Sequence, residues 1–291
     1  MNQLYDLFLS PFQDFLFMRH ALVACLALAL GCGPVGVLLV LRRMSLVGDA
    51  LSHAVLPGAA LGFLIAGLSL YAMTLGGIAV GLAVALLAGA VTRLTVLRED
   101  ASFAALYLIS LASGVLLISL RGSNIDLIHV LFGTILAVDD AALILVAAIT
   151  TATLLILALI YRPLIVECFD PGFLRSVGGR GAAMHSIFLV LVVLNLVAGF
   201  RALGTLMAVG MMMVPAVSAR FWARQVWSTA LVAVVIAMLS GYTGLLLSFH
   251  ANLPSGPAII LTAGLCYVFS VVFGMHGSIY GRHRKGEHLA G

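Results

Sequence analysis

The sequence holds an acidic and an imidazole side chain at helical spacing inside an apolar segment. Asp49 and His53 lie four residues apart near the start of the run from Ser45 to Gly67. On a helix both would project from one face, so a single ion could contact both. A carboxylate and an imidazole suit zinc, manganese or ferrous iron, and the absence of a nearby thiolate disfavours a cuprous site. Ionisable residues inside a membrane segment usually mark an ion or substrate path.

Two explanations of this pair are compatible with its spacing. Two ligands are too few for a tight metal site, but a homodimer with these helices at its axis would supply two carboxylates and two imidazoles around one point. Alternatively, Asp49 caps the N-terminus of the helix and His53 hydrogen-bonds to a backbone carbonyl. The spacing leaves metal binding and helix capping both open.

A second segment, from Phe169 to Gly179, has the pattern of a short helix in a loop. Asp170 can cap its start, Pro171 fits the first helical position, and Gly178 with Gly179 can end it. We therefore expect a helix of about two turns within this loop.

The apolar residues of this short helix are spaced to form one exposed face. They are Phe173, Leu174 and Val177, at positions i, i+1 and i+4. Such a face could fit a groove of a partner protein. The alternative is a loop helix that packs on the membrane surface.

The composition indicates that both segments belong to a membrane protein. Of the 291 residues, 63% are hydrophobic and only 9% are charged, whereas a soluble domain carries about a quarter charged residues. The chain is therefore expected to be one transmembrane domain over residues 1–291, embedded in a lipid bilayer. The net charge is +4, but the arginines are scattered at the ends of apolar runs and form no basic face, so no nucleic-acid partner is expected.

Nine continuous apolar runs are long enough to predict membrane helices, and they lack the two-residue alternation of a barrel. They are Ala21 to Leu41, Ser45 to Gly67, Tyr71 to Val91, Ser102 to Leu120, Ala141 to Ile160, Met184 to Phe200, Leu203 to Ala219, Ser228 to Phe249 and Pro257 to Met275. A shorter run, Leu127 to Val138, is interrupted by Gly133 and predicts a half-helix or re-entrant piece. The expected fold class is an all-α polytopic membrane protein with about nine transmembrane helices.

The arginines predict the orientation, because short loops rich in Lys and Arg stay in the cytoplasm. If nine spans alternate, most basic residues fall on one side, with Arg19, Arg121 and Arg201 as exceptions. The N-terminus is then outside, with residues 1–17 as an amphipathic outer segment. The loop helix at 169–179 and the tail at 277–291 are cytoplasmic.

Glycines recur at four-residue spacing in the first half of the chain, as in Gly58 with Gly62 and Gly77 with Gly81. This spacing permits close contact between helices. The alternative is that it reflects only the ordinary glycine content of membrane helices.

The stretch from Val47 to Phe63, VGDALSHAVLPGAALGF, resembles the signature of the membrane permease subunits of bacterial zinc and manganese ABC importers. The resemblance continues through Leu131 to Leu136, through Phe169-Asp170-Pro171 with Gly178, and through Gly204 to Ala219, so it covers most of the chain.

This resemblance implies a type II ABC importer permease fold in a bacterial inner membrane. It implies a second permease copy, two cytoplasmic ABC ATPase subunits and an extracytoplasmic binding protein that delivers the metal. Asp49 and His53 would lie on the path of a transported zinc or manganese ion, and no permanently bound cofactor is expected. The segment that couples to the ATPase would comprise Phe169, Asp170, Pro171, Phe173, Leu174, Val177 and Gly178.

The source of energy is expected to lie on a separate chain. The sequence contains no G-x-x-x-x-G-K-[ST] run, and its single lysine, Lys285, is in the C-terminal tail, so we expect no ATPase activity of its own. Two other functions stay open. One is a secondary transporter driven by an ion gradient with Asp49 as its coupling site. The other is a siderophore or cobalamin permease, which would not need an Asp-His pair at helical spacing.

Overall fold

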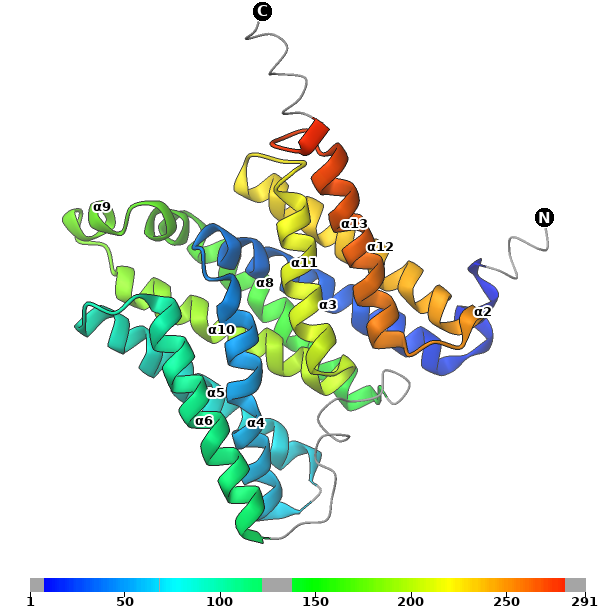
Figure 1. Cartoon of the computed structure of the whole chain (residues 1–291), viewed down its shortest axis with the longest axis horizontal. Coiled ribbons are helices and arrows are strands. Elements are labelled where there is room, and N and C mark those ends of the chain that lie inside the picture. The colour runs from blue at the N-terminus through cyan, green and yellow to red at the C-terminus, as the bar shows by residue number, and fades with distance from the viewer. Residues whose placement is uncertain (1–7, 68, 122–137, 281–291) are drawn as a thin grey trace, which may run out of the picture.

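The computed structural model describes residues 8–67, 69–121 and 138–280, and every regular element in these ranges is a helix (Figure 1). In chain order the helices are α2 (Ser10–Asp14), α3 (Leu16–Leu41), α4 (Ser45–Ala66), α5 (Leu70–Leu94), α6 (Glu99–Arg121), α8 (Asp140–Phe169), α9 (Pro171–Ser176), α10 (Gly181–Leu203), α11 (Thr205–Ala219), α12 (Val226–Ala251) and α13 (Ser255–Phe273).

All nine apolar runs are helical, which confirms the all-α membrane architecture. Within the described ranges, eight helices are long and apolar enough to cross a membrane, and α11 is the shorter ninth with 15 residues. At 1.5 Å per residue α11 is about 22 Å long, which is less than a hydrocarbon core of about 30 Å. The predicted re-entrant piece from Leu127 lies outside the described residues except for Val138.

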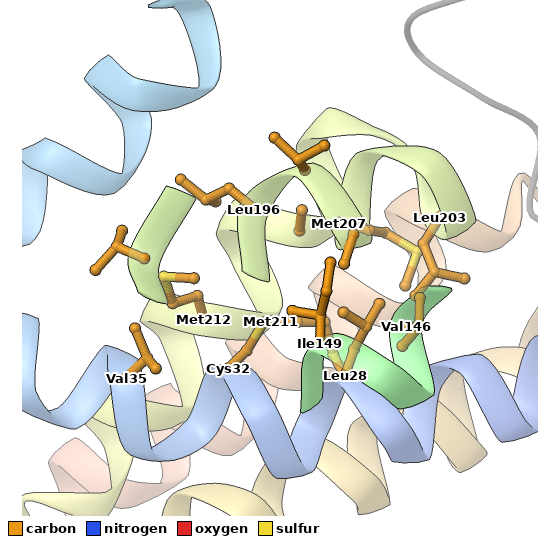
Figure 2. Packing of buried hydrophobic residues seen from close by; sticks show 14 of the residues in the cluster. Leu28, Cys32, Val35, Val146, Ile149, Leu196, Leu203, Met207, Met211 and Met212 are labelled. Carbon is orange, nitrogen blue, oxygen red and sulfur yellow. The ribbon is translucent and has the colours of Figure 1, made fainter. Parts of the chain in front are cut away.

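The core forms where α11 packs against α3, α10, α12 and α13. In Figure 2, Met207, Met211 and Met212 of α11 lie close to Leu28 and Cys32 of α3. All five side chains are at most 1% exposed. The methionine cluster thus fills the space between helices, as this flexible side chain commonly does, and α11 is held in the interior although it is short.

Helices α4, α5 and α6 pack closely on one another and are called here the three-helix group. The contact between α4 and α5 depends on glycine, because a β-carbon on Gly58 would collide with the carbonyl oxygen of Gly76, and one on Gly62 with that of Ala72. Gly77 lies against the Val55 side chain. The glycine spacing therefore does mark a close helix contact, as one of the two sequence explanations proposed.

Replacing Gly58 with alanine should destabilise the chain, because the added methyl group must push α4 away from the α5 backbone. We expect a cost of about 1–3 kcal/mol, as for other overpacked interiors. A thiol-reactive dye that reports exposure of the buried Cys25 and Cys32 on heating would measure it. Gly264→Ala in α13 is the matched control, because a β-carbon there meets nothing within 4 Å. An unchanged melting temperature for Gly58→Ala would contradict the close contact.

The two ends of the bundle are each tied by polar side chains. At one end Arg201 of α10 pairs with Asp139 at 3.1 Å, and Asp139 also accepts a hydrogen bond from the Ala142 amide to cap α8. His20 of α3 contacts Asp140 at the same end. Arg201 was an exception to the arginine pattern, and its charge is neutralised by this pair. The opposite end, where Arg42 and Arg93 lie, is called the arginine-rich end below.

Candidate functional site

Asp49 and His53 do come together on α4. The Nε2 atom of His53 lies 3.8 Å from Oδ1 of Asp49. The helix begins at Ser45, four residues before Asp49, and its N-cap residue Met44 makes no side-chain cap. Asp49 is therefore inside the helix, where its own amide already has a helical partner, and the explanation of Asp49 as a helix cap is wrong.

The face of α4 that carries this pair is uncovered. The side chain of Asp49 is 67% exposed and that of His53 is 46% exposed, and Leu46 on the same face is also exposed. By contrast, Leu51 and Ala54 are fully buried against the neighbouring helices. One face of α4 thus completes the three-helix group, and the other presents a carboxylate and an imidazole outward.

The chain offers this pair few further ligands. In the described ranges, no group of three or more His, Cys, Asp or Glu side chains could hold a metal ion. Pro57 has no amide hydrogen, so the carbonyl of His53 loses the donor that a helix would normally provide. The pair therefore supplies one oxygen and one nitrogen on an open face, and a tight site would need ligands from elsewhere.

The predicted loop helix is present as α9, which begins at Pro171 as expected and ends at Ser176, so it is shorter than the two turns expected. The Oδ1 atom of Asp170 accepts a hydrogen bond from the Phe173 amide at 2.8 Å, and Pro171 is the first helical residue. Gly178 has a φ of +74°, a conformation that favours glycine. The Gly179 amide then donates to the Leu174 carbonyl at 2.8 Å. The sequence thus predicted both ends of this helix for the right reasons.

The exposed face of this helix differs from the predicted one. Phe173 and Val177 are exposed, at 56% and 61%, and Phe169 at the end of α8 is 64% exposed. Leu174 is only 8% exposed, because its side chain turns back against Gly179. The expectation that Leu174 lies on the exposed face is therefore wrong, and the apolar surface consists of Phe169, Phe173 and Val177. We call these three residues the docking surface; in Figure 1, α9 lies at the edge of the molecule.

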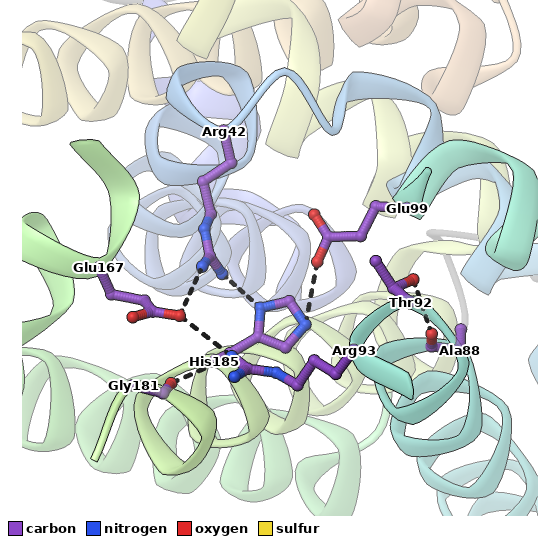
Figure 3. A network of polar contacts seen from close by, with 8 residues as sticks. All are labelled: Arg42, Ala88, Thr92, Arg93, Glu99, Glu167, Gly181 and His185. Carbon is purple, nitrogen blue, oxygen red and sulfur yellow. Dashed lines mark hydrogen bonds and ion pairs between the residues drawn. The ribbon is translucent and has the colours of Figure 1, made fainter. Parts of the chain in front are cut away.

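Sequence reasoning missed a third group of polar side chains, which meets at the arginine-rich end. Figure 3 shows these side chains, which come from the ends of α3, α5, α6, α8 and α10. We call this group the polar network: Arg42, Arg93, Glu99, Glu167 and His185. The arginines served only as markers of topology, and the network residues lie up to 143 positions apart in the chain. Glu167, an acidic residue among the apolar residues of 163–169, was a signal that could have pointed to it.

The polar network is closely bonded. Glu167 Oε1 accepts from Arg93 Nη2 at 3.0 Å and lies 3.8 Å from Arg42 Nη2. Arg42 Nη1 lies 2.7 Å from Nδ1 of His185, and Nε2 of His185 lies 3.0 Å from Glu99 Oε1. Because arginine can only donate, Nδ1 of His185 must accept, so Nε2 carries the proton and donates to Glu99.

Comparison with known proteins gives concordant results. Residues 14–274 match the model of the ABC 3 transport family. The chain is 34% identical to the manganese import system permease protein ScaB of Streptococcus parasanguinis, over 97% of both chains. It is 30% identical to the manganese transport system membrane protein MntC of Halalkalibacterium halodurans, over 96% of this chain and 95% of that one.

A solved structure is similar over nearly the whole chain. It is PsaBC from Streptococcus pneumoniae in complex with Fab, at a TM-score of 0.80 and 30% identity, and the match covers 95% of this chain and 97% of that one. The helical arrangement in Figure 1 is thus one that an experimentally determined protein also adopts.

Proposed function

Because the chain belongs to the ABC 3 transport family, we propose that it is the membrane permease subunit of an importer that moves manganese across a bacterial inner membrane. The observation that carries this proposal is the Asp49–His53 pair, which α4 holds on an uncovered face within a membrane helix. Ionisable groups are costly there and are kept where an ion must pass. The relatives named above, which are manganese permeases, support the same cargo.

The pair suits a cargo that must be released again. One carboxylate and one imidazole bind manganese, zinc or ferrous iron, and zinc binds such ligands more tightly than manganese does. A site with few protein ligands holds either metal weakly and lets it leave. We therefore propose that the affinity of this pair does not select the metal. The metal-binding protein that delivers the ion and the geometry of the path would select it.

A second permease copy is proposed to cover the open face of α4. Two side-chain ligands come from one chain in the described ranges, and both are exposed. A second copy related by a two-fold axis would bring the same two groups to the same place. The metal would then pass between four ligands at the interface of the two copies.

The docking surface is proposed to bind a cytoplasmic ABC ATPase. Phe169, Phe173 and Val177 form an apolar patch at the arginine-rich end, and a small apolar helix fits a groove of a partner. Short loops rich in arginine are retained in the cytoplasm, so this end faces the ATPase and the N-terminus is outside. A metal-binding protein would deliver the ion at the opposite end, where Asp139 and Asp140 lie.

Uptake of radioactive manganese by membrane vesicles tests the function. The permease, reconstituted with its cognate ABC ATPase and metal-binding protein, should accumulate manganese only when ATP is supplied on the cytoplasmic side. Uptake that continues without ATP but stops when the proton or sodium gradient is collapsed would favour a secondary transporter instead. Uptake of a siderophore or cobalamin without uptake of free manganese would overturn the assignment of the cargo.

A further inference from the structure

We propose that the polar network is a rigid joint: it connects α9 to the three-helix group, which carries Asp49 and His53, and transmits movement of α9 to that group. The inference deepens the proposed function and rests on it, because it takes α9 as the element that the ATPase moves. The network residues are positioning residues, which act on the metal path through the helices that they connect.

The network holds the chain on both sides of α9. Glu167 lies in the last turn of α8, three residues before Asp170, and His185 lies in the first turns of α10. Arg42, at the C-terminal end of α3, contacts both of them, at 3.8 Å and 2.7 Å. Its guanidinium also lies over the Phe188 ring, 5.4 Å from the ring centre. A displacement of α9 must therefore move Glu167 and His185, and through Arg42 the end of α3.

The network also crosses to the three-helix group. Helix α6 packs on α4 and α5, whereas α8 packs on α3 and α10. Arg93, in the last turn of α5, donates to Glu167 at 3.0 Å and to the Gly181 carbonyl at 3.2 Å. Glu99, the first residue of α6, pairs with His185 at 3.0 Å. These bonds join the ends of α5 and α6 to the two residues that flank α9 (Figure 3).

The joint is stiff because it is largely buried and its charges balance. The side chains of Glu167 and His185 are 5% and 3% exposed, and that of Arg42 is 9% exposed. Two arginines face two glutamates, and the imidazole is neutral by its hydrogen bonds, so no net charge is left in the interior. Each member of the network has at least one partner, although the buried Oε2 atom of Glu167 has none in the part of the chain that the structure describes. Paired buried groups hold their geometry, because each broken bond leaves an uncompensated group. A β-carbon on Gly181 would collide with Glu167 Oε2, so the backbone also fits closely here.

Helix α6 passes the movement on to the metal pair. The Ser110 hydroxyl of α6 donates to the Ala54 carbonyl of α4 at 3.2 Å, directly after His53. The Tyr107 ring lies 6.1 Å from the His53 ring. A β-carbon on Gly114 would lie 2.8 Å from the Pro57 side chain, so α6 and α4 are in close contact there. A shift of the α6 end that begins at Glu99 therefore reaches α4 beside Asp49 and His53.

The test measures manganese uptake per ATP hydrolysed in the reconstituted transporter. Arg93→Gln should leave the complex assembled and hydrolysing ATP, while uptake per ATP falls about tenfold, the size of effect expected when a coupling element loses the contacts of one residue. Arg93→Lys keeps a cation beside Glu167 and should restore most of the ratio. Arg98→Gln is the matched control. It removes an arginine from the loop that follows α5, where the side chain is 87% exposed and makes a long contact of 4.0 Å with Asp100.

A second variant distinguishes loss of coupling from loss of folding. Glu99→Gln removes the charge but keeps an oxygen that can accept from His185, and it should also lower uptake per ATP. A purely structural network would lower the yield of complex, ATP hydrolysis and uptake together and leave their ratio unchanged. That result, or a wild-type ratio in both Arg93→Gln and Glu99→Gln, would overturn the proposal.

A distance measurement separates this inference from the proposed function. Spin labels at the exposed positions Val96, beside Glu99, and Arg180, after α9, report whether the two sides of the joint move together. The label distance should stay the same with and without ATP in the wild-type complex, and its distribution should broaden in Arg93→Gln. If the wild-type complex hydrolyses ATP but carries no manganese, the proposed function fails. The label distances still show whether the polar network moves as one rigid unit. A wild-type distance that changes on ATP binding would refute a rigid joint.

Discussion

Asp49→Asn should abolish manganese uptake while the transporter still assembles and hydrolyses ATP. Asparagine has nearly the same shape as aspartate, but it removes the negative charge that offsets a divalent cation. We expect uptake to fall by about 100-fold, as for loss of a direct metal contact. Because Asp49 is 67% exposed and pairs only with His53 in the described ranges, the change should leave the fold intact. The measurement is uptake of radioactive manganese and zinc in vesicles with equal amounts of complex.

Three control experiments show whether a loss of uptake in Asp49→Asn comes from loss of a metal ligand. His53→Ala removes the nitrogen ligand and should damage uptake to a similar degree. Asp100→Asn changes an acidic residue that lies 4.0 Å from Arg98, and it should leave uptake unchanged. In complexes that contain one wild-type and one Asp49→Asn chain, a shared site predicts impaired uptake, whereas separate paths predict half of the wild-type rate. Near-normal uptake by Asp49→Asn would exclude this pair from the metal path.

Phe173→Ala should release the ATPase from the permease. Phe173 is the aromatic residue of the docking surface, and aromatic anchors at interfaces commonly contribute about 2–4 kcal/mol. A loss of this size weakens binding by roughly 30-fold to 1000-fold, which is enough to dissociate the complex during purification. The measurement is the amount of ATPase that co-purifies with tagged permease.

Phe273→Ala is the matched control for the docking prediction. Phe273 ends α13 and is 56% exposed, the same fraction as Phe173, but it packs on Phe269 with ring centres 4.9 Å apart. Its replacement should leave the amount of co-purified ATPase unchanged. Equal recovery of ATPase with Phe173→Ala and wild type would remove α9 as the docking element, and equal losses with both phenylalanine variants would mean that the effect is not specific to α9.

The membrane helices and the short α9 could be predicted because their signals are local. Hydropathy over about 20 residues defines a span, and a cap, a proline and a glycine lie within a few positions of each other around α9. The buried position of Leu174 could not be read from spacing, because the turn at Gly178 folds the chain back over it. The same applies to Asp49, whose place inside α4 depends on where the helix begins after Met44.

The polar network shows the limit of such reasoning most clearly. Its bonds join residues from five helices, and each residue alone looks like an ordinary flanking charge. They are brought together by the packing of α8 on α3, of α10 on α3, α5 and α8, and of α6 on α5. Side-chain pairing between distant helices leaves no periodic trace in a single sequence, whereas the Asp49–His53 pair lies within one turn and was therefore found.

The uncovered face of α4 also bears on how the transporter is made. Without the second copy proposed above, the chain would hold the Asp49 carboxylate against lipid, which costs several kcal/mol in the hydrocarbon region. The proposed pairing of two copies would remove this charge from contact with lipid. The two residues proposed to bind the metal would then also favour the assembled pair over the single chain in the membrane.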